Sequence, residues 1–128
     1  LSTINPVGND GWYKRGDEKV PMYDQQAIEI MAMVCMYFQA FMVTRETAYI
    51  KKMYTSYRWF LGENSLRIPL YDEETKGCAD GLQANGVNRN QGAESTLAYL
   101  ISHLTVLQAF KYEHHLTGVV ATKTLVQN

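Results

Sequence analysis

Carboxylate and amide side chains gather at two places in the sequence, each just ahead of a predicted helix. The first is the run Asp24-Gln25-Gln26, and the second lies within "GVNRNQGAEST", from Gly86 to Thr96. Such side chains can cap a helix N-terminus, and they can also exchange hydrogen bonds with a polar ligand. The two runs are therefore either helix caps or parts of a binding site.

The ligand that these residue types suit best is a carbohydrate. Sugar hydroxyls both donate and accept hydrogen bonds, so they are met by Asp, Asn, Gln and Arg, while aromatic rings cover the sugar faces. The candidate binding residues are Trp12, Asp24, Gln25, Gln26, Asn88, Arg89 and Asn90, and the candidate catalytic carboxylates are Asp80 and Glu94. In the alternative interpretation, each of these side chains has a purely structural role and only caps a helix or closes a turn.

Glycoside hydrolysis is a specific chemistry that these carboxylates allow. It needs two carboxyl groups roughly 5 to 10 Å apart across the glycosidic bond. Asp80 with Glu94, or Asp24 with Glu94, are conceivable pairs. An anion at a helix N-terminus is stabilised by the helix dipole, so Glu94 is expected to accept hydrogen bonds from hydroxyls. With Asn90 as N-cap, Glu94 falls one residue too late to close a capping box.

Metal and nucleotide chemistry find little support. Aligned on an EF-hand loop, residues 72–83 place Lys76 and Gln83 where oxygen-rich ligands are needed. His114 and His115 are adjacent and diverge on a helix, which disfavours a metal pair. The sequence contains no P-loop, GxGxxG, GxSxG or HExxH motif. No metal and no cofactor is predicted.

Composition limits the partners and the compartment. The 12 basic and 13 acidic residues nearly cancel and form no run of like charge, so neither nucleic acid nor an anionic membrane is an expected partner. Cys35 and Cys78 lack metal-binding spacing and are typical of free thiols in a reducing compartment, which favours the cytoplasm. The longest apolar run, residues 27–42, is interrupted by Glu29 and Gln39, so no membrane span is expected.

Three helices are predicted, with long loops between them. The first, residues 25–42, is apolar nearly all round and should be buried on most faces, with Asp24 as its N-cap. The second, residues 45–61, is amphipathic, and Gly62 ends it. The third, residues 94–112, carries an apolar stripe made of Leu97, Leu100, Ile101, Leu104 and Leu107.

The segments outside these helices have different expected roles. The long polar loop over residues 63–93 is the expected place of a site, because ordered loops of this length usually carry one. Residues 117–128 are predicted to be a short strand or a flexible tail. At 128 residues the chain is expected to form a single domain. It begins at Leu1 and not at Met, and it is expected to be a piece of a longer protein.

Several stretches resemble a known family. They are "LSTINPVGNDGWYKRGD", "YDQQAIEIMAMV", "YRWFLGEN", "IPLYDEETKGCADGL" and "GVNRNQGAESTLAYLISHL". Together they cover about residues 1–104 and resemble the helical region C-terminal to the nucleotide-sugar-binding module of bacterial group 1 glycosyltransferases. The sequence departs from the family pattern at Ala27, where a proline is usual, and at Lys76, where a glycine is usual.

The resemblance implies an all-α fold in which α/α-hairpins form the closing part of an α/α-toroid of the six-hairpin glycosidase type. It implies that loops at one mouth of the toroid bind a glycan through the candidate residues given above. The donor-binding module lies outside this chain, so the chain alone is not expected to transfer sugar. The apolar first helix of such a fragment allows a homo-oligomer to form through it.

Three functions remain open. The first is a carbohydrate-active or carbohydrate-binding part of a bacterial glycosyltransferase. The second is a glycosidase-like enzyme whose acid and base include Glu94 and Asp80. The third is a non-catalytic helical interaction domain, in which alanine at the polar loop positions would change no sugar affinity.

Overall fold

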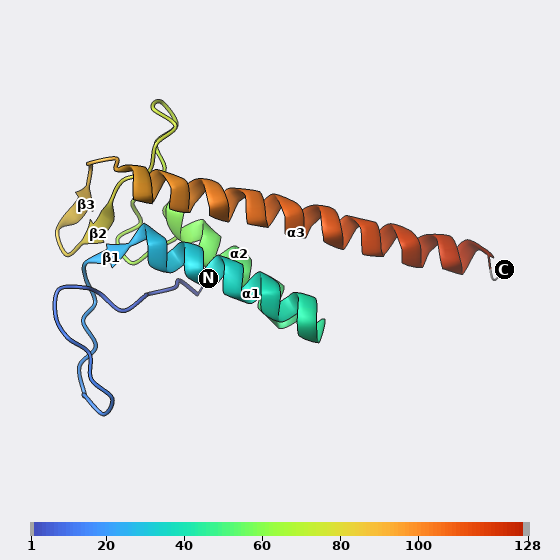
Figure 1. Cartoon of the computed structure of the whole chain (residues 1–128), viewed down its shortest axis with the longest axis horizontal. Helices are drawn as coiled ribbons and strands as arrows, with labels where there is room; N and C mark the ends of the chain where they lie inside the picture. The colour runs from blue at the N-terminus through green and yellow to red at the C-terminus, as the bar shows by residue number, and fades with distance from the viewer. Residues whose placement is uncertain (1, 127–128) are drawn as a thin grey trace.

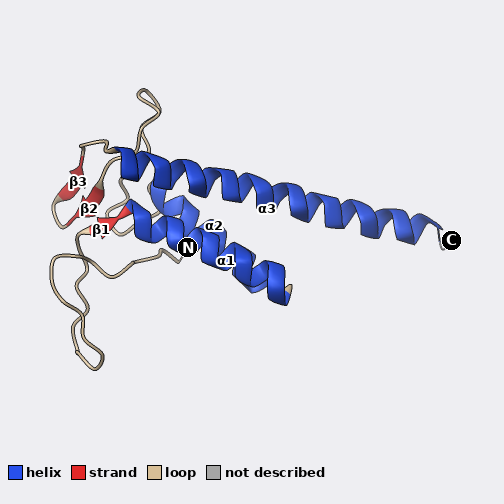
Figure 2. Cartoon of the chain, in the orientation of Figure 1, coloured by secondary structure: helices blue, strands red, loops and turns tan. Residues whose placement is uncertain are grey.

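A computed structural model describes residues 2–126, with side chains for residues 2–115. Three helices and a small sheet make up the described chain (Figure 1, Figure 2). The helices are α1 (Ala27–Thr44), α2 (Thr47–Arg58) and α3 (Ala93–Val126), with a 3-10 turn η1 (Trp59–Leu61) after α2. The strands are β1 (Gln25–Gln26), β2 (Gly81–Gln83) and β3 (Gly86–Asn88).

The sheet corrects the predicted fold class. An all-α fold forming part of an α/α-toroid is wrong: the chain is a small mixed α/β domain, about half helical, with an antiparallel sheet in the order β1-β2-β3. Gln83 pairs with Gly86 across a two-residue turn, a loop length typical of β-hairpins. Each strand spans only two or three residues, too few for alternation to reveal it in the sequence.

Helix α1 buries one stripe and not most of its surface. Its buried side chains are Ala27, Ile30, Val34, Phe38 and Phe41, at the helical spacing of three and four residues. Four further apolar side chains, Met31, Met33, Tyr37 and Met42, are only partly buried against the core, and Ile28, Met36 and Val43 are exposed. Full burial of α1 is therefore confined to one stripe, less than the sequence predicts. By length and composition alone, α1 is also apolar enough to cross a membrane. The buried stripe accounts for its composition within this fold.

Local contacts set where α1 begins and ends. The backbone N–H of Gln26 donates to a carboxylate oxygen of Glu29 at 3.3 Å, so Gln26 and not Asp24 stands at the helix entrance. Arg45 ends the helix in the left-handed conformation and donates its backbone N–H to the carbonyl of Phe41 at 2.8 Å. Helix α2 then returns along α1 as an antiparallel hairpin (Figure 1).

Helix α3 packs on the hairpin through its small-residue face, and not through the leucine stripe that the sequence would place against the core. Its buried side chains are Ser95, Ala98, Tyr99, Ser102 and Ala109, and the leucine stripe points away from the core. Small residues let the axes of packed helices approach closely. The helix runs on to Val126, where a strand or a flexible tail was predicted, and residues 127 and 128 lie outside the described part of the chain.

Two fully buried amides fix the connections to the core. Gln25 accepts a hydrogen bond from Nε1 of Trp59 at 2.9 Å and donates to the carbonyl of Met22. Asn64 donates to the carbonyls of Trp59 and Ile68 and accepts from backbone N–H groups in the same loop. These bonds hold β1 and the segment after η1 against the hydrophobic core.

The N-termini of α1 and α3 lie together beside the sheet (Figure 1). Strand β1 leads directly into α1, and β3 is followed by α3 after only four residues. The positive ends of both helix dipoles therefore meet at the same end of the molecule as the strands. This is where the polar candidate residues gather.

Candidate functional site

A cleft of about 390 Å³ lies at this shared end. Four segments line it: the entry to α1, the start of β2, the end of β3 and the first turn of α3. Its lining residues are Asp24, Gln26, Asp80, Asn88, Gly92, Ala93, Glu94 and Ser95. Five of these are candidate residues from the sequence analysis, brought together from positions up to 70 apart in the chain.

Asp80 is the most firmly held carboxylate of the cleft. Its Oδ1 accepts a hydrogen bond from the backbone N–H of Gly92 at 2.8 Å, and its Oδ2 accepts one from the side-chain amide of Asn90. The Asn90 bond, with help from Gly92 and Ser95, lowers the pKa of Asp80 below its usual value. Asp80 is therefore ionised at neutral pH and fixed in orientation.

Asp24 stands in the opposite environment. Its Oδ1 is buried and makes no hydrogen bond to any other group in the described residues. Desolvation raises the pKa of Asp24 above its usual value. A hydrogen bond with Gln26 lowers this pKa in part, and the negative charges of Asp10 and Asp80 raise it further. The two aspartates of one cleft thus have pKa values displaced in opposite directions.

Two glycines allow both aspartates to approach the backbone. A Cβ on Gly81 would lie 2.5 Å from Oδ1 of Asp24, and one on Gly92 would lie 2.9 Å from Oδ1 of Asp80. Neither distance is compatible with a real side chain. These two glycines and Ser95 were not predicted as parts of the site, although a glycine next to a candidate acid is a signal of close backbone approach.

The remaining candidate residues lie outside the cleft lining. Trp12 is 91% exposed on the loop before β1 and lines neither the cleft nor any other described cavity. Gln25 is fully buried and serves the core through Trp59. Asn90 acts on the cleft through its bond to Asp80.

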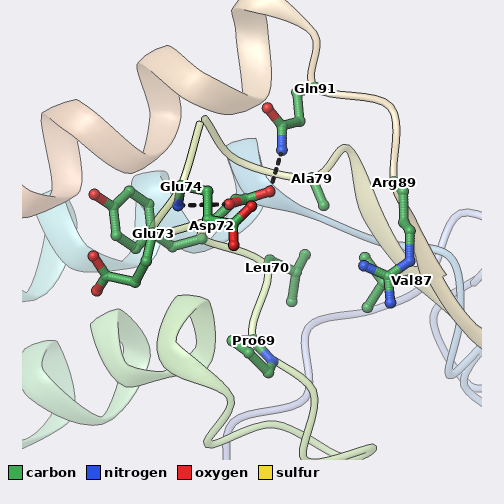
Figure 3. A pocket seen from close by; sticks show the side chains of 10 residues that line it. Pro69, Leu70, Asp72, Glu73, Glu74, Ala79, Val87, Arg89 and Gln91 are labelled. Atoms are coloured by element: carbon green, nitrogen blue, oxygen red, sulfur yellow. Dashed lines mark hydrogen bonds between the residues drawn. The ribbon is translucent and has the colours of Figure 1, made fainter. Parts of the chain in front are cut away.

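Arg89 belongs to a second cavity, of about 460 Å³, on the other side of β3. Figure 3 shows Arg89 on one side of this cavity and the carboxylate of Asp72 on the other, with Leu70 between them. Asp72 accepts hydrogen bonds from the backbone N–H groups of Thr75 and Glu74 and from the amide of Gln91. These bonds lower its pKa and make it a rigid anion.

The two cavities share one wall. Ala79, Val87 and Arg89 line the second cavity, while Asp80 and Asn88 line the cleft. Successive side chains of an extended segment point to opposite faces, which explains the alternation. A register shift of one residue would exchange the two sets.

The side chains that line the cleft suit a neutral polar ligand. Among its lining residues are three carboxylates, two amides and one hydroxyl, and no Lys or Arg. Anionic ligands such as phosphates would be repelled by this set, whereas hydroxyl groups could donate to the carboxylates and accept from the amides. No cluster of His, Cys, Asp and Glu that could hold a metal ion occurs among the described residues.

Comparison of the sequence with protein-family models and with curated proteins found no match.

Proposed function

We propose that this chain is a carbohydrate-binding part of a bacterial glycosyltransferase, and that the cleft between Asp24 and Asp80 holds a sugar residue of the acceptor glycan. One observation carries the proposal. The stretches "YDQQ", "CADGL" and "GVNRNQGAEST", which carry the resemblance to that family, also supply every residue of the cleft lining.

The charge of the cleft favours the acceptor over the donor. A nucleotide-sugar donor carries a diphosphate, which needs cationic side chains or a metal to balance it. The cleft lining has carboxylates in place of cations. A neutral glycan satisfies these groups through its hydroxyls, and the fixed carboxylate of Asp80 would accept hydrogen bonds from two of them.

Saturation-transfer difference NMR with neutral mono- and disaccharides tests the proposal. We expect saccharide signals with the purified chain and their loss with Asp80→Asn, because the amide has one acceptor oxygen in place of two. The matched control is Glu18→Gln, which makes the same change of charge on an exposed loop residue outside the cleft lining. No binding at millimolar saccharide, or equal binding by Asp80→Asn, would refute the proposal.

A second candidate, glycoside hydrolysis, is favoured by the opposed pKa shifts of Asp24 and Asp80. Environments that separate the pKa values of two carboxyl groups are typical of an acid and its partner base. Asp24 would protonate the glycosidic oxygen as its bond to the anomeric carbon breaks. Asp80 or Glu94 would take a proton from the water that attacks that carbon.

Fluorogenic glycosides separate the two candidates. Hydrolysis predicts measurable turnover that falls about 100-fold or more in Asp24→Asn while saccharide binding persists, and an equal fall in Glu94→Gln would assign the role of base to Glu94. Binding alone predicts no turnover in any form of the protein. If the parent chain shows no turnover and the variants lose saccharide binding, the hydrolytic candidate is excluded and the binding candidate is kept.

A further inference from the structure

The outer face of α3 carries a continuous apolar stripe. Six large side chains between 43% and 62% exposed follow one another along it: Leu97, Leu100, Ile101, Leu104, Leu107 and Phe110. Single exposed apolar residues are common on proteins, but a contiguous stripe marks a contact surface. Its counterpart on the inner face, built from Ser102 and small residues, already holds the hairpin of α1 and α2.

The stripe is complementary to a second copy of itself. Leu97, Leu100, Leu104 and Leu107 follow the alternating spacing of three and four residues that places leucines at the a and d positions of two heptads. No Asp, Glu, Lys or Arg occurs from Ser95 to Phe110. Two identical faces could therefore meet without bringing like charges together, which is the requirement of a two-fold interface.

The exposed apolar area of α3 and its open outer side are also consistent with a second copy of the chain as the partner. Half-exposed side chains of this size leave an apolar surface of roughly 500 Å² on each copy. A standard interface buries about 800 Å² on each partner, so the stripe would form its apolar centre and flanking polar residues its rim. Helix α3 also extends well past the ends of α1 and α2 (Figure 1), which leaves its outer side open to another helix.

We propose that the chain forms a homodimer in which the outer faces of two α3 helices pack against each other. The contact lies on α3, whereas the sequence suggested α1 as the site of self-association. The exposed apolar side chains of α1, Ile28, Met36 and Val43, are spaced eight and seven residues apart and offer a much sparser stripe. The dimer is independent of the glycan cleft, because no stripe residue lines it.

Sedimentation velocity from 1 to 100 µM tests the proposal. We expect a dimer for the parent chain and a monomer for the double variant Leu100→Glu/Leu104→Glu, in which four buried carboxylates would weaken association by about 100-fold or more. Both side chains are exposed in the single chain, so helicity by circular dichroism should be unchanged. The control Val43→Glu changes an apolar residue that is 84% exposed at the end of α1 and should leave the dimer intact.

A second variant separates contact from charge. Leu100→Ala/Leu104→Ala keeps helix propensity and adds no charge, and it should raise the dimer dissociation constant by about 10-fold or more. A parent chain that is monomeric at 100 µM overturns the proposal, and binding of that monomer to phosphatidylcholine vesicles would reassign the stripe to a lipid surface. A dimer that persists in both double variants overturns it as well.

Discussion

Removing the charge of Asp24 should stabilise the protein. In the folded chain its Oδ1 is buried without a hydrogen bond to a described group, and desolvation raises its pKa above the ordinary value of 3.8. At neutral pH the fold must either hold a poorly solvated carboxylate or keep a proton that the unfolded chain releases. Both alternatives cost free energy, so Asp24→Asn is expected to increase the free energy of unfolding.

The expected gain is about 1 kcal/mol, since a buried polar atom without a partner costs roughly 1 to 3 kcal/mol and the neutral amide retains part of that cost. For a domain of this size it corresponds to a rise in Tm of roughly 3 to 6 °C. The pH dependence has a definite sign. Below the ordinary pKa, Asp24 is protonated in both states and the variant gains nothing; the difference develops as pH rises through the folded-state pKa.

Thermal unfolding followed by circular dichroism at pH 7 and pH 3 measures both quantities. The control Glu18→Gln removes an exposed charge and should change stability by less than about 0.5 kcal/mol at pH 7. If Asp24→Asn is less stable than the parent at pH 7, or gains as much at pH 3, the buried oxygen does not carry the cost assigned to it. A gain in stability together with a loss of saccharide binding would mark Asp24 as a residue retained for function.

Three further changes test the supports of the cleft. Asn64→Ala removes buried hydrogen bonds to backbone groups and should lower the free energy of unfolding by about 2 to 4 kcal/mol in urea titrations; a loss below 1 kcal/mol would contradict the role given to this loop. Gln25→Ala leaves the indole N–H of Trp59 buried without its acceptor, and we expect a loss of about 3 kcal/mol and a shift in tryptophan fluorescence, whereas an unchanged spectrum would argue against the contact. Gly92→Ala forces a Cβ toward the carboxylate of Asp80, so saccharide affinity should fall about 10-fold with a smaller loss of stability; retention of full affinity would show that this carboxylate can move without consequence.

The sequence predicts which residues line the cleft only in part, and it does not predict that they come together. Asp24, Gln26, Asp80, Asn88 and Glu94 were singled out because polar residues ahead of helices are either caps or ligands, and the structure places all five around one cleft. Pairing between residues so far apart depends on how the chain folds back. No local pattern shows that strand β1 pairs with β2.

The sequence alone determined the existence of the three helices and where α1 and α2 turn. Apolar spacing and the stop at Gly62 are local properties, since they depend on neighbours within one or two turns. The polar character of the segment between α2 and α3 was equally evident. These features follow from backbone geometry and side-chain type, whatever the rest of the chain does.

Only the tertiary structure decided which face of each element is buried. The leucine stripe of α3 predicts an inward face, yet the fold seats Ala98 and Ser102 there, because small side chains allow close contact with the hairpin. The strands escaped detection because two or three residues carry no period of their own. The opposed environments of Asp24 and Asp80 likewise arise from burial on one side and hydrogen bonding on the other, and both depend on segments distant in sequence.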